Sequence, residues 1–118
     1  MVEDDREMLR GLRLLLSESG YEVTATDGVR AALAALRASP PDLALLDHAL
    51  KDGTAFDLLG AFAEIDAGVP SVVLTGTAEA DLEQRLLAKG ARAFLAKPVN
   101  PGALLAALAG ALTARPAR

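Results

Sequence analysis

The sequence predicts an α/β domain built on a doubly wound parallel sheet, with helices on both faces. The first observation is that strand and helix patterns alternate along the chain, which is the order produced by parallel strands and crossover helices. The second is that residues 43–46 and 72–74 are uninterrupted apolar runs, as is typical of strands buried on both faces. The third is that no repeat, linker or low-complexity block interrupts the pattern, so residues 1–118 are expected to form a single domain.

The first third of the chain is expected to contain two helices with a strand between them. Residues 6–19 carry leucines at helical spacing, and Gly20 is well suited to end that helix. Residues 21–26 place apolar side chains at alternate positions, which favours a strand. Asp27 is a suitable N-cap for a second helix that extends to Ala38.

The middle of the chain repeats the alternation. Pro40-Pro41 stops the second helix, because the residue before a proline disfavours helical backbone. Residues 43–46 then form a buried strand, residues 56–64 a short helix and residues 69–75 another strand.

The last third completes the pattern with two helices and a strand. Thr77 is a candidate N-cap for a helix that ends at Gly90. Residues 93–96 are an apolar strand, and residues 103–114 form a final helix before Pro116.

Composition and charge exclude several classes of function. With 52% hydrophobic residues the chain can bury a sizeable core, which argues against disorder. A net charge of -4 argues against direct binding of nucleic acid, which needs clustered lysines and arginines. The absence of cysteine excludes disulfides and thiolate metal sites. Because neither a signal peptide nor an apolar run of membrane-spanning length is present, we expect a soluble cytoplasmic protein.

The candidate functional residues are polar groups at the ends of predicted strands. They are Glu3-Asp4-Asp5, Asp47, Thr75 and Lys97. Ligands of open parallel sheets bind beyond the carboxyl ends of the strands, so we expect these groups to share a pocket. Oxygen ligands without histidine or cysteine suit Mg²⁺, and a carboxylate can form an aspartyl phosphate. Glu3, Asp4 and Asp47 would bring about three negative charges into this pocket, which favours binding of a cation, whereas Asp5 is expected to favour the start of the first helix.

On four segments the chain resembles the receiver domain of two-component response regulators. The segments are Val2-Glu3-Asp4-Asp5, Asp47 with Leu50-Lys51-Asp52-Gly53, Val73-Leu74-Thr75-Gly76, and Phe94-Leu95-Ala96-Lys97-Pro98. Each is weak alone, but their order and spacing make the set specific, and the resemblance covers essentially the whole chain. It implies a flavodoxin-like sheet of five parallel strands in the order 2-1-3-4-5.

The resemblance also implies roles for the residues of the site. Asp47 is the expected phosphoacceptor. The expected ligands of Mg²⁺ or Mn²⁺ are Glu3, Asp4, Asp47 and the backbone carbonyl of Ala49. Lys97 is expected to contact the phosphoryl group and to precede a cis peptide bond to Pro98. Thr75 is expected to donate to a phosphoryl oxygen and to form a switch pair with Phe94.

The implied function is a signalling switch that catalyses its own phosphorylation and dephosphorylation. Its expected partner is a sensor histidine kinase or a histidine phosphotransfer protein. The output face, made of the fourth helix, the last strand and the last helix, is expected to bind an effector or a second copy, without direct contact to nucleic acid or membrane. Because the last helix is apolar all round, Ala107 and Ala111 are the interface candidates.

The chain departs from the family pattern at three places. Lys51 replaces the usual proline and Ala55 the usual glycine of the loop after Asp47, which leaves the shape of that loop open. The family's first strand has several more apolar residues before its acid pair, whereas only Met1 and Val2 precede Glu3 here. We therefore expect a shortened first strand.

Two alternative functions are weighed against this one. The first is an interaction module of the same fold that works without phosphate. The second is a small nucleotide- or flavin-binding protein, against which the absence of G-x-G-x-x-G and G-x-x-x-x-G-K-[ST] counts. Four further charged residues are expected to be solvated surface residues: Asp52, Asp57, Asp66 and Arg85.

Overall fold

The computed structural model describes residues 1–65, 68–76 and 81–113. The helices are α1 (Arg6–Glu18), α2 (Val29–Ala38), α3 (Ala55–Ile65), α4 (Leu82–Ala88) and α5 (Pro101–Thr113). The strands are β1 (Ala44–Asp47), β2 (Ala49–Leu50), β3 (Gly53–Thr54), β4 (Ser71–Thr75) and β5 (Ala93–Ala96). Three predicted strands are therefore confirmed as β1, β4 and β5, and the predicted N-cap Thr77 lies outside the described residues.

The main sheet is parallel and has the order β1-β4-β5. Beside β1, Val2 makes isolated parallel bridges to Leu46 on one side and to Thr26 on the other. The Val2 N–H donates to the Leu45 carbonyl at 2.8 Å, and the Asp47 N–H donates to the Val2 carbonyl at 2.9 Å. Val2 thus occupies the place next to β1 in the sheet.

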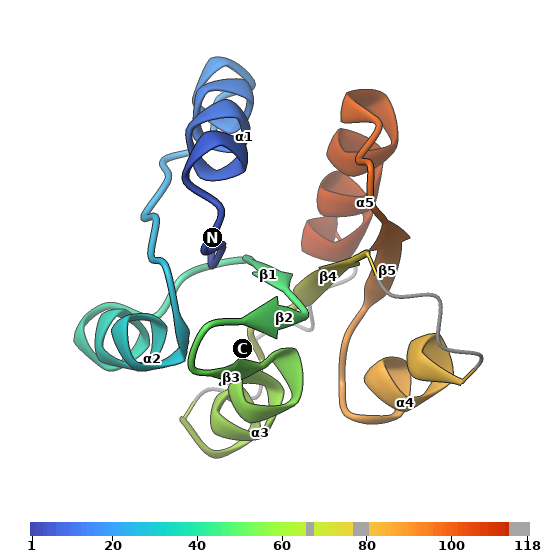
Figure 1. Ribbon diagram of the computed structural model, residues 1–118. Coiled ribbons are helices and arrows are strands. Elements are labelled where there is room, and N and C mark those ends of the chain that lie inside the picture. The colour runs from blue at the N-terminus through green and yellow to red at the C-terminus, as the bar shows by residue number, and fades with distance from the viewer. Residues whose placement is uncertain (66–67, 77–80, 114–118) are drawn as a thin grey trace.

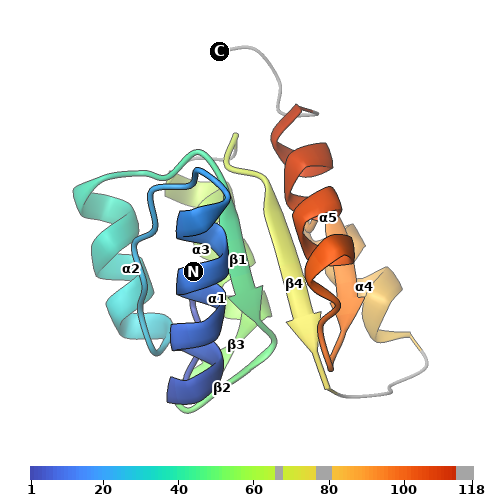
Figure 2. The same ribbon diagram turned by 90° about the horizontal axis from the view of Figure 1, so that it is seen from above.

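Helices cover both faces of this sheet. Figure 1 shows α1 and α5 on one face and α2, α3 and α4 on the other. Side chains alternate between the two sides along a strand, so Leu46 packs with α2 and α3, whereas Leu45 packs with α1 and α5. Figure 2 shows the arrowheads of β1 and β4 pointing toward the same edge.

The predicted strand over residues 21–26 is wrong in its extent. Only Thr26 bridges to a neighbour, because Val2 alone offers a paired residue there. The expectation of a shortened first strand agrees with this geometry. The hairpin of β2 and β3 was not predicted, since two-residue strands are too short to produce a periodic pattern.

The start of α2 also differs from the prediction. Its N-cap is Gly28, without a capping side chain of its own, and not Asp27. The Asp27 carboxylate instead pairs with the Lys51 ammonium at 2.9 Å. By contrast, α1 ends as predicted, with Gly20 at a φ of 96° where glycine is favoured.

The prediction of Ala111 as an interface candidate is wrong. Ala111 is 4% exposed and packs in the core with Leu104 and Leu108, because these three positions share one face of α5. Ala107 is half-buried and packs on the same core. Of the predicted surface residues, Asp66 lies outside the described residues. Within the parts of the chain that are described, no helix has the combined length and apolar character needed to cross a membrane.

Candidate functional site

The predicted site residues converge at one edge of the sheet. Asp47 is the last residue of β1 and Thr75 the last of β4, while Lys97 directly follows β5. Glu3 follows Val2, the residue that pairs beside β1. Backbone pairing continues past the strands, since the Lys97 N–H donates to the Thr75 carbonyl at 2.7 Å. The carboxyl ends of the parallel strands therefore bring these side chains together.

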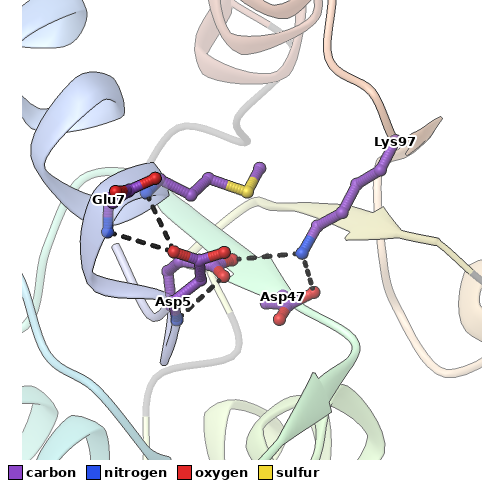
Figure 3. Close-up of polar contacts among 6 residues, drawn as sticks. Asp5, Glu7, Asp47 and Lys97 are labelled. Atoms are coloured by element: carbon purple, nitrogen blue, oxygen red, sulfur yellow. Dashed lines mark hydrogen bonds and ion pairs between the residues drawn. The ribbon is translucent and has the colours of Figure 1, made fainter.

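An ion-pair network lies at the centre of the site. The Lys97 ammonium is 2.9 Å from Asp47 Oδ1 and 3.4 Å from Glu3 Oε2. Figure 3 shows Lys97 reaching from its loop toward Asp47. Glu3 is 1% exposed and Asp47 5% exposed. Such buried carboxylates need a compensating charge, and Lys97 supplies part of it.

Glu3, Asp4 and Asp47 form the acidic group of the site. Oxygen atoms of these three carboxylates lie within 4.8 Å of one another. Asp5 is directed elsewhere, because its carboxylate caps α1 by accepting from the N–H groups of Glu7 at 3.0 Å and Met8 at 3.2 Å (Figure 3). The geometry thus places Glu3 and Asp4, and not Asp5, beside Asp47. Asp5 has the helix-start role expected from the sequence.

Burial and charge shift the ionisation of the site. Burial, followed by the negative charge of Asp47, raises the pKa of Glu3. Burial lowers the pKa of Lys97, but the hydrogen bond and charge of Asp47 and the charge of Glu3 outweigh it, so this pKa is raised overall. Lys97 therefore stays protonated at neutral pH. A single ammonium among three carboxylates leaves excess negative charge, and these oxygen donors fit Mg²⁺ or Mn²⁺.

Replacing Glu3 with glutamine is expected to stabilise the metal-free protein and to weaken its binding of Mg²⁺. A raised pKa means that the contribution of Glu3 to stability is greatest below its ordinary pKa of 4.5 and is lost as pH rises through the raised pKa. At neutral pH in EDTA, the substitution should raise the free energy of unfolding by about 1 kcal/mol. Urea unfolding at neutral pH and at acidic pH measures the change in stability, and calorimetric titration with Mg²⁺ measures the change in metal binding. A loss of stability at neutral pH would contradict this account.

The backbone carbonyl expected to bind metal belongs to Ala49, in the β2–β3 hairpin. Ala49 pairs with Thr54, so its position depends on the hairpin. One end of the hairpin is fixed next to α3. The Ala55 N–H donates to the His48 carbonyl at 3.0 Å, and the Thr54 N–H donates to Asp57 Oδ2 at 2.9 Å. Asp57 is exposed, as expected, and its carboxylate also holds the Thr54 backbone at the start of α3.

The predicted switch residues lie on adjacent strands. Thr75 is 2% exposed at the end of β4. Phe94 in β5 is partly buried against the core formed with α2, α3 and α4. The peptide bond between Lys97 and Pro98 is cis, the isomer expected from the sequence.

Sequence reasoning missed contacts that connect the site to helices. The His48 ring packs edge-to-face on Phe56 at 5.4 Å, and the Arg85 guanidinium lies 5.1 Å from the centre of the Phe56 ring. Arg85 is exposed, as expected, and this contact also links α4 to α3. Asp52 is exposed, as expected, and its carboxylate also accepts from N–H groups at the start of α2. The contacts of Arg85 and of Asp52 join residues far apart in the sequence, so no local pattern predicts them.

Comparisons with known proteins agree with this geometry. The family model described as the response regulator receiver domain matches residues 1–109. The chain is similar to the transcriptional regulatory protein KdpE of Mycobacterium tuberculosis, with 30% identity over 112 residues that cover 95% of this chain and 49% of KdpE. It therefore spans about half the length of that regulator.

Solved structures of response regulators are also similar to this chain. A CheY-like response regulator receiver domain protein from Methanospirillum hungatei has a TM-score of 0.90 and 31% identity, covering 97% of this chain and 91% of that one. A response regulator protein from Burkholderia pseudomallei has a TM-score of 0.83 and 26% identity, covering 91% of this chain and 63% of that one. The latter structure contains a phosphorylated aspartic acid, a calcium ion and citrate.

Proposed function

The chain belongs to the response regulator receiver domain family of two-component signalling, and we propose that it accepts a phosphoryl group on Asp47 from a phosphohistidine. The donor is a sensor histidine kinase or a histidine phosphotransfer protein. The observation that carries the proposal is the buried Asp47 carboxylate, paired with Lys97 at 2.9 Å beside Glu3 and Asp4. Residues 1–118 are proposed to act as one domain.

The proposed reaction is an in-line displacement at phosphorus. An Asp47 carboxylate oxygen forms a bond to phosphorus while the bond from phosphorus to the imidazole nitrogen breaks. The departing nitrogen keeps the electron pair of that bond and takes a proton from solvent water. The product is an aspartyl phosphate. Lys97 stays protonated and neutralises charge on the phosphoryl oxygens, where a positioned cation has its largest effect. Hydrolysis of the aspartyl phosphate returns the carboxylate and resets the switch.

A divalent cation is proposed to be held by Glu3, Asp4, Asp47 and the Ala49 carbonyl. When bound, it would neutralise carboxylate and phosphoryl charge together. The fit rests on the donor chemistry, since the three carboxylates gather within 4.8 Å and Lys97 offsets only part of their charge. The proposed output is a rearrangement of Thr75 and Phe94 that alters the face of α4, β5 and α5.

Substitution of Asp47 with asparagine is expected to abolish phosphorylation. With acetyl phosphate and Mg²⁺, intact-mass spectrometry should show one added phosphoryl group on the wild type and none on Asp47→Asn, because the amide is a poor nucleophile. Beryllofluoride should likewise bind only the wild type. Amide hydrogen exchange should change in α4 and β5 with the wild type alone.

The outcomes separate this function from its rival. A wild type that neither gains a phosphoryl group nor binds beryllofluoride would support a phosphate-independent interaction module. Modification of Asp47→Asn at the wild-type rate would place the acceptor at another residue. Asp42→Asn removes a carboxylate outside the site and should behave like the wild type.

A further inference from the structure

The turn of the β2–β3 hairpin contacts a helix distant in the sequence. Lys51 and Asp52 form this turn between the paired residues Leu50 and Gly53. One Asp52 oxygen accepts from the Val29 N–H at 2.7 Å, and the other accepts from the Arg30 N–H at 3.1 Å. Asp52 therefore caps α2 from another segment of the chain.

These hydrogen bonds fit the electrostatics of a helix start. The first N–H groups of a helix lack partners within the helix and carry partial positive charge, which favours a carboxylate there. The N–H groups of Val29 and then Arg30 lower the pKa of Asp52. Both oxygens of this one side chain are engaged, so its orientation is fixed although it lies on the surface.

Gly28 provides a second, independent observation. A Cβ atom at this position would lie 2.8 Å from Asp52 Oδ1, closer than such atoms approach. The backbone of Gly28 is extended, with a φ of −173° that any residue adopts. The absence of a side chain at Gly28 is therefore needed for the approach of Asp52 and not for the backbone.

The contact bears on the site through the hairpin. Ala49 lies two residues after Asp47 and one residue pair from the turn. The hairpin has only two paired residues in each strand, too few to hold a shape alone. Its Thr54 end is fixed at α3, as described above, whereas its turn is fixed by Asp52 on α2. Ala49 belongs to the short hairpin that these two attachments hold.

We propose that Asp52 is a positioning residue for the divalent cation, because its attachment to α2 holds the Ala49 carbonyl toward the site. The inference rests on the proposed function, from which Ala49 takes its role as a ligand. Asp52 does not touch the cation in this account. It acts through the hairpin, in the way that groups behind a metal ligand orient that ligand.

The test is calorimetric titration of the full chain with Mg²⁺. Asp52→Ala should weaken Mg²⁺ binding about 10-fold, the lower end of the effect of such positioning groups. Gly28→Ala should weaken it similarly, since the new methyl group displaces the Asp52 carboxylate while every carboxylate is retained. Asp52→Asn keeps one good acceptor oxygen and should give an intermediate affinity.

Asp27→Ala is the matched control. It also removes one negative charge beside the turn, and it breaks only the exposed pair with Lys51, which contributes little. Its Mg²⁺ affinity should stay within about twofold of the wild type. An equal loss with Asp27→Ala would overturn the inference, because net charge and not position would then explain the effect.

Melting in EDTA separates positioning from helix capping. Loss of the cap alone would lower the melting temperature of Asp52→Ala and Gly28→Ala while leaving their Mg²⁺ affinity unchanged, and this result would overturn the inference. Weakened binding by both folded variants supports it. The proposed function fails separately, through a wild type that neither binds Mg²⁺ nor becomes phosphorylated.

Discussion

Lys97→Ala is expected to lower the rate of phosphorylation by acetyl phosphate about 100-fold, because the phosphoryl oxygens lose their positioned ammonium. It is also expected to lower the free energy of unfolding in EDTA by about 2 kcal/mol, since Glu3 and Asp47 then lack their counter-charge. The loss is smaller than for a fully enclosed pair, because the Lys97 side chain is 25% exposed.

The loss of stability should depend on pH and on metal. The raised pKa of Lys97 means that its contribution to stability is present below its ordinary pKa of 10.5 and is lost only as pH rises through the raised value. At low pH the loss of stability is limited by the carboxylates. Burial and the charge of Asp47 raise the pKa of Glu3, so Glu3 becomes neutral as pH falls and no longer needs a counter-charge. The difference between wild type and Lys97→Ala should therefore shrink in acid, and saturating Mg²⁺ should reduce it at neutral pH.

Urea unfolding at acidic and neutral pH, with and without Mg²⁺, measures this dependence. Lys51→Ala is the control, because its ion pair with Asp27 is exposed on both sides and should contribute less than about 1 kcal/mol. Equal stability of Lys97→Ala and the wild type in EDTA at neutral pH would show that the buried carboxylates do not need this ammonium.

The predictable part of the molecule is the part encoded by local pattern. The strand ends carrying Asp47 and Thr75 were predicted because each terminates a continuous apolar run, and parallel pairing then places the two residues at one edge. The position of Lys97 was predicted in the same way, since Lys97 comes directly after the apolar residues of β5. The choice of Glu3 and Asp4 as the expected metal-binding pair came from the resemblance to receiver domains, because no local pattern separates them from Asp5.

The remaining features depend on contacts between distant segments. Asp52 caps a helix that begins 23 residues earlier, so neither segment reveals the contact by itself. The burial of Ala111 depends on which face of an apolar helix meets the sheet, and a helix without charged residues encodes that face only weakly. The segment 21–26 alternates like a strand but lacks a partner along most of its length. Propensity does not determine pairing.

An extension of roughly four apolar, β-branched residues before Met1 is expected to raise the free energy of unfolding by about 2 kcal/mol. An open cavity of about 750 Å³ lies beside Met1 and is lined by residues 20–24 and 43–46. Core side chains from both faces of the sheet also line it, namely Leu16, Leu36, Phe62 and Leu108, together with the exposed Leu112. Because the Leu45 carbonyl accepts from Val2, the Leu45 N–H faces the same side and can pair with an added residue.

The gain in stability from the extension has two sources, which are removal of the buried Met1 ammonium and filling of the cavity. Its dependence on pH distinguishes them. Burial lowers the pKa of the Met1 ammonium to about 6, from its usual value of 8.0. The unfolded chain therefore binds more protons between these values, and the wild type loses stability as pH falls through them. Any extension replaces this ammonium with an amide and removes that loss, but only an apolar extension also fills the cavity.

A glycine-serine extension of equal length is therefore the control. At about pH 8.5 only the apolar extension should raise the urea midpoint, whereas at about pH 5.5 both should raise it, and the apolar one more. Equal midpoints for the wild type and the apolar extension at the higher pH would show that residues 21–26 and β1 do not accept a strand between them. A gain confined to the apolar extension at both values would assign the effect to packing, with no contribution from the buried ammonium.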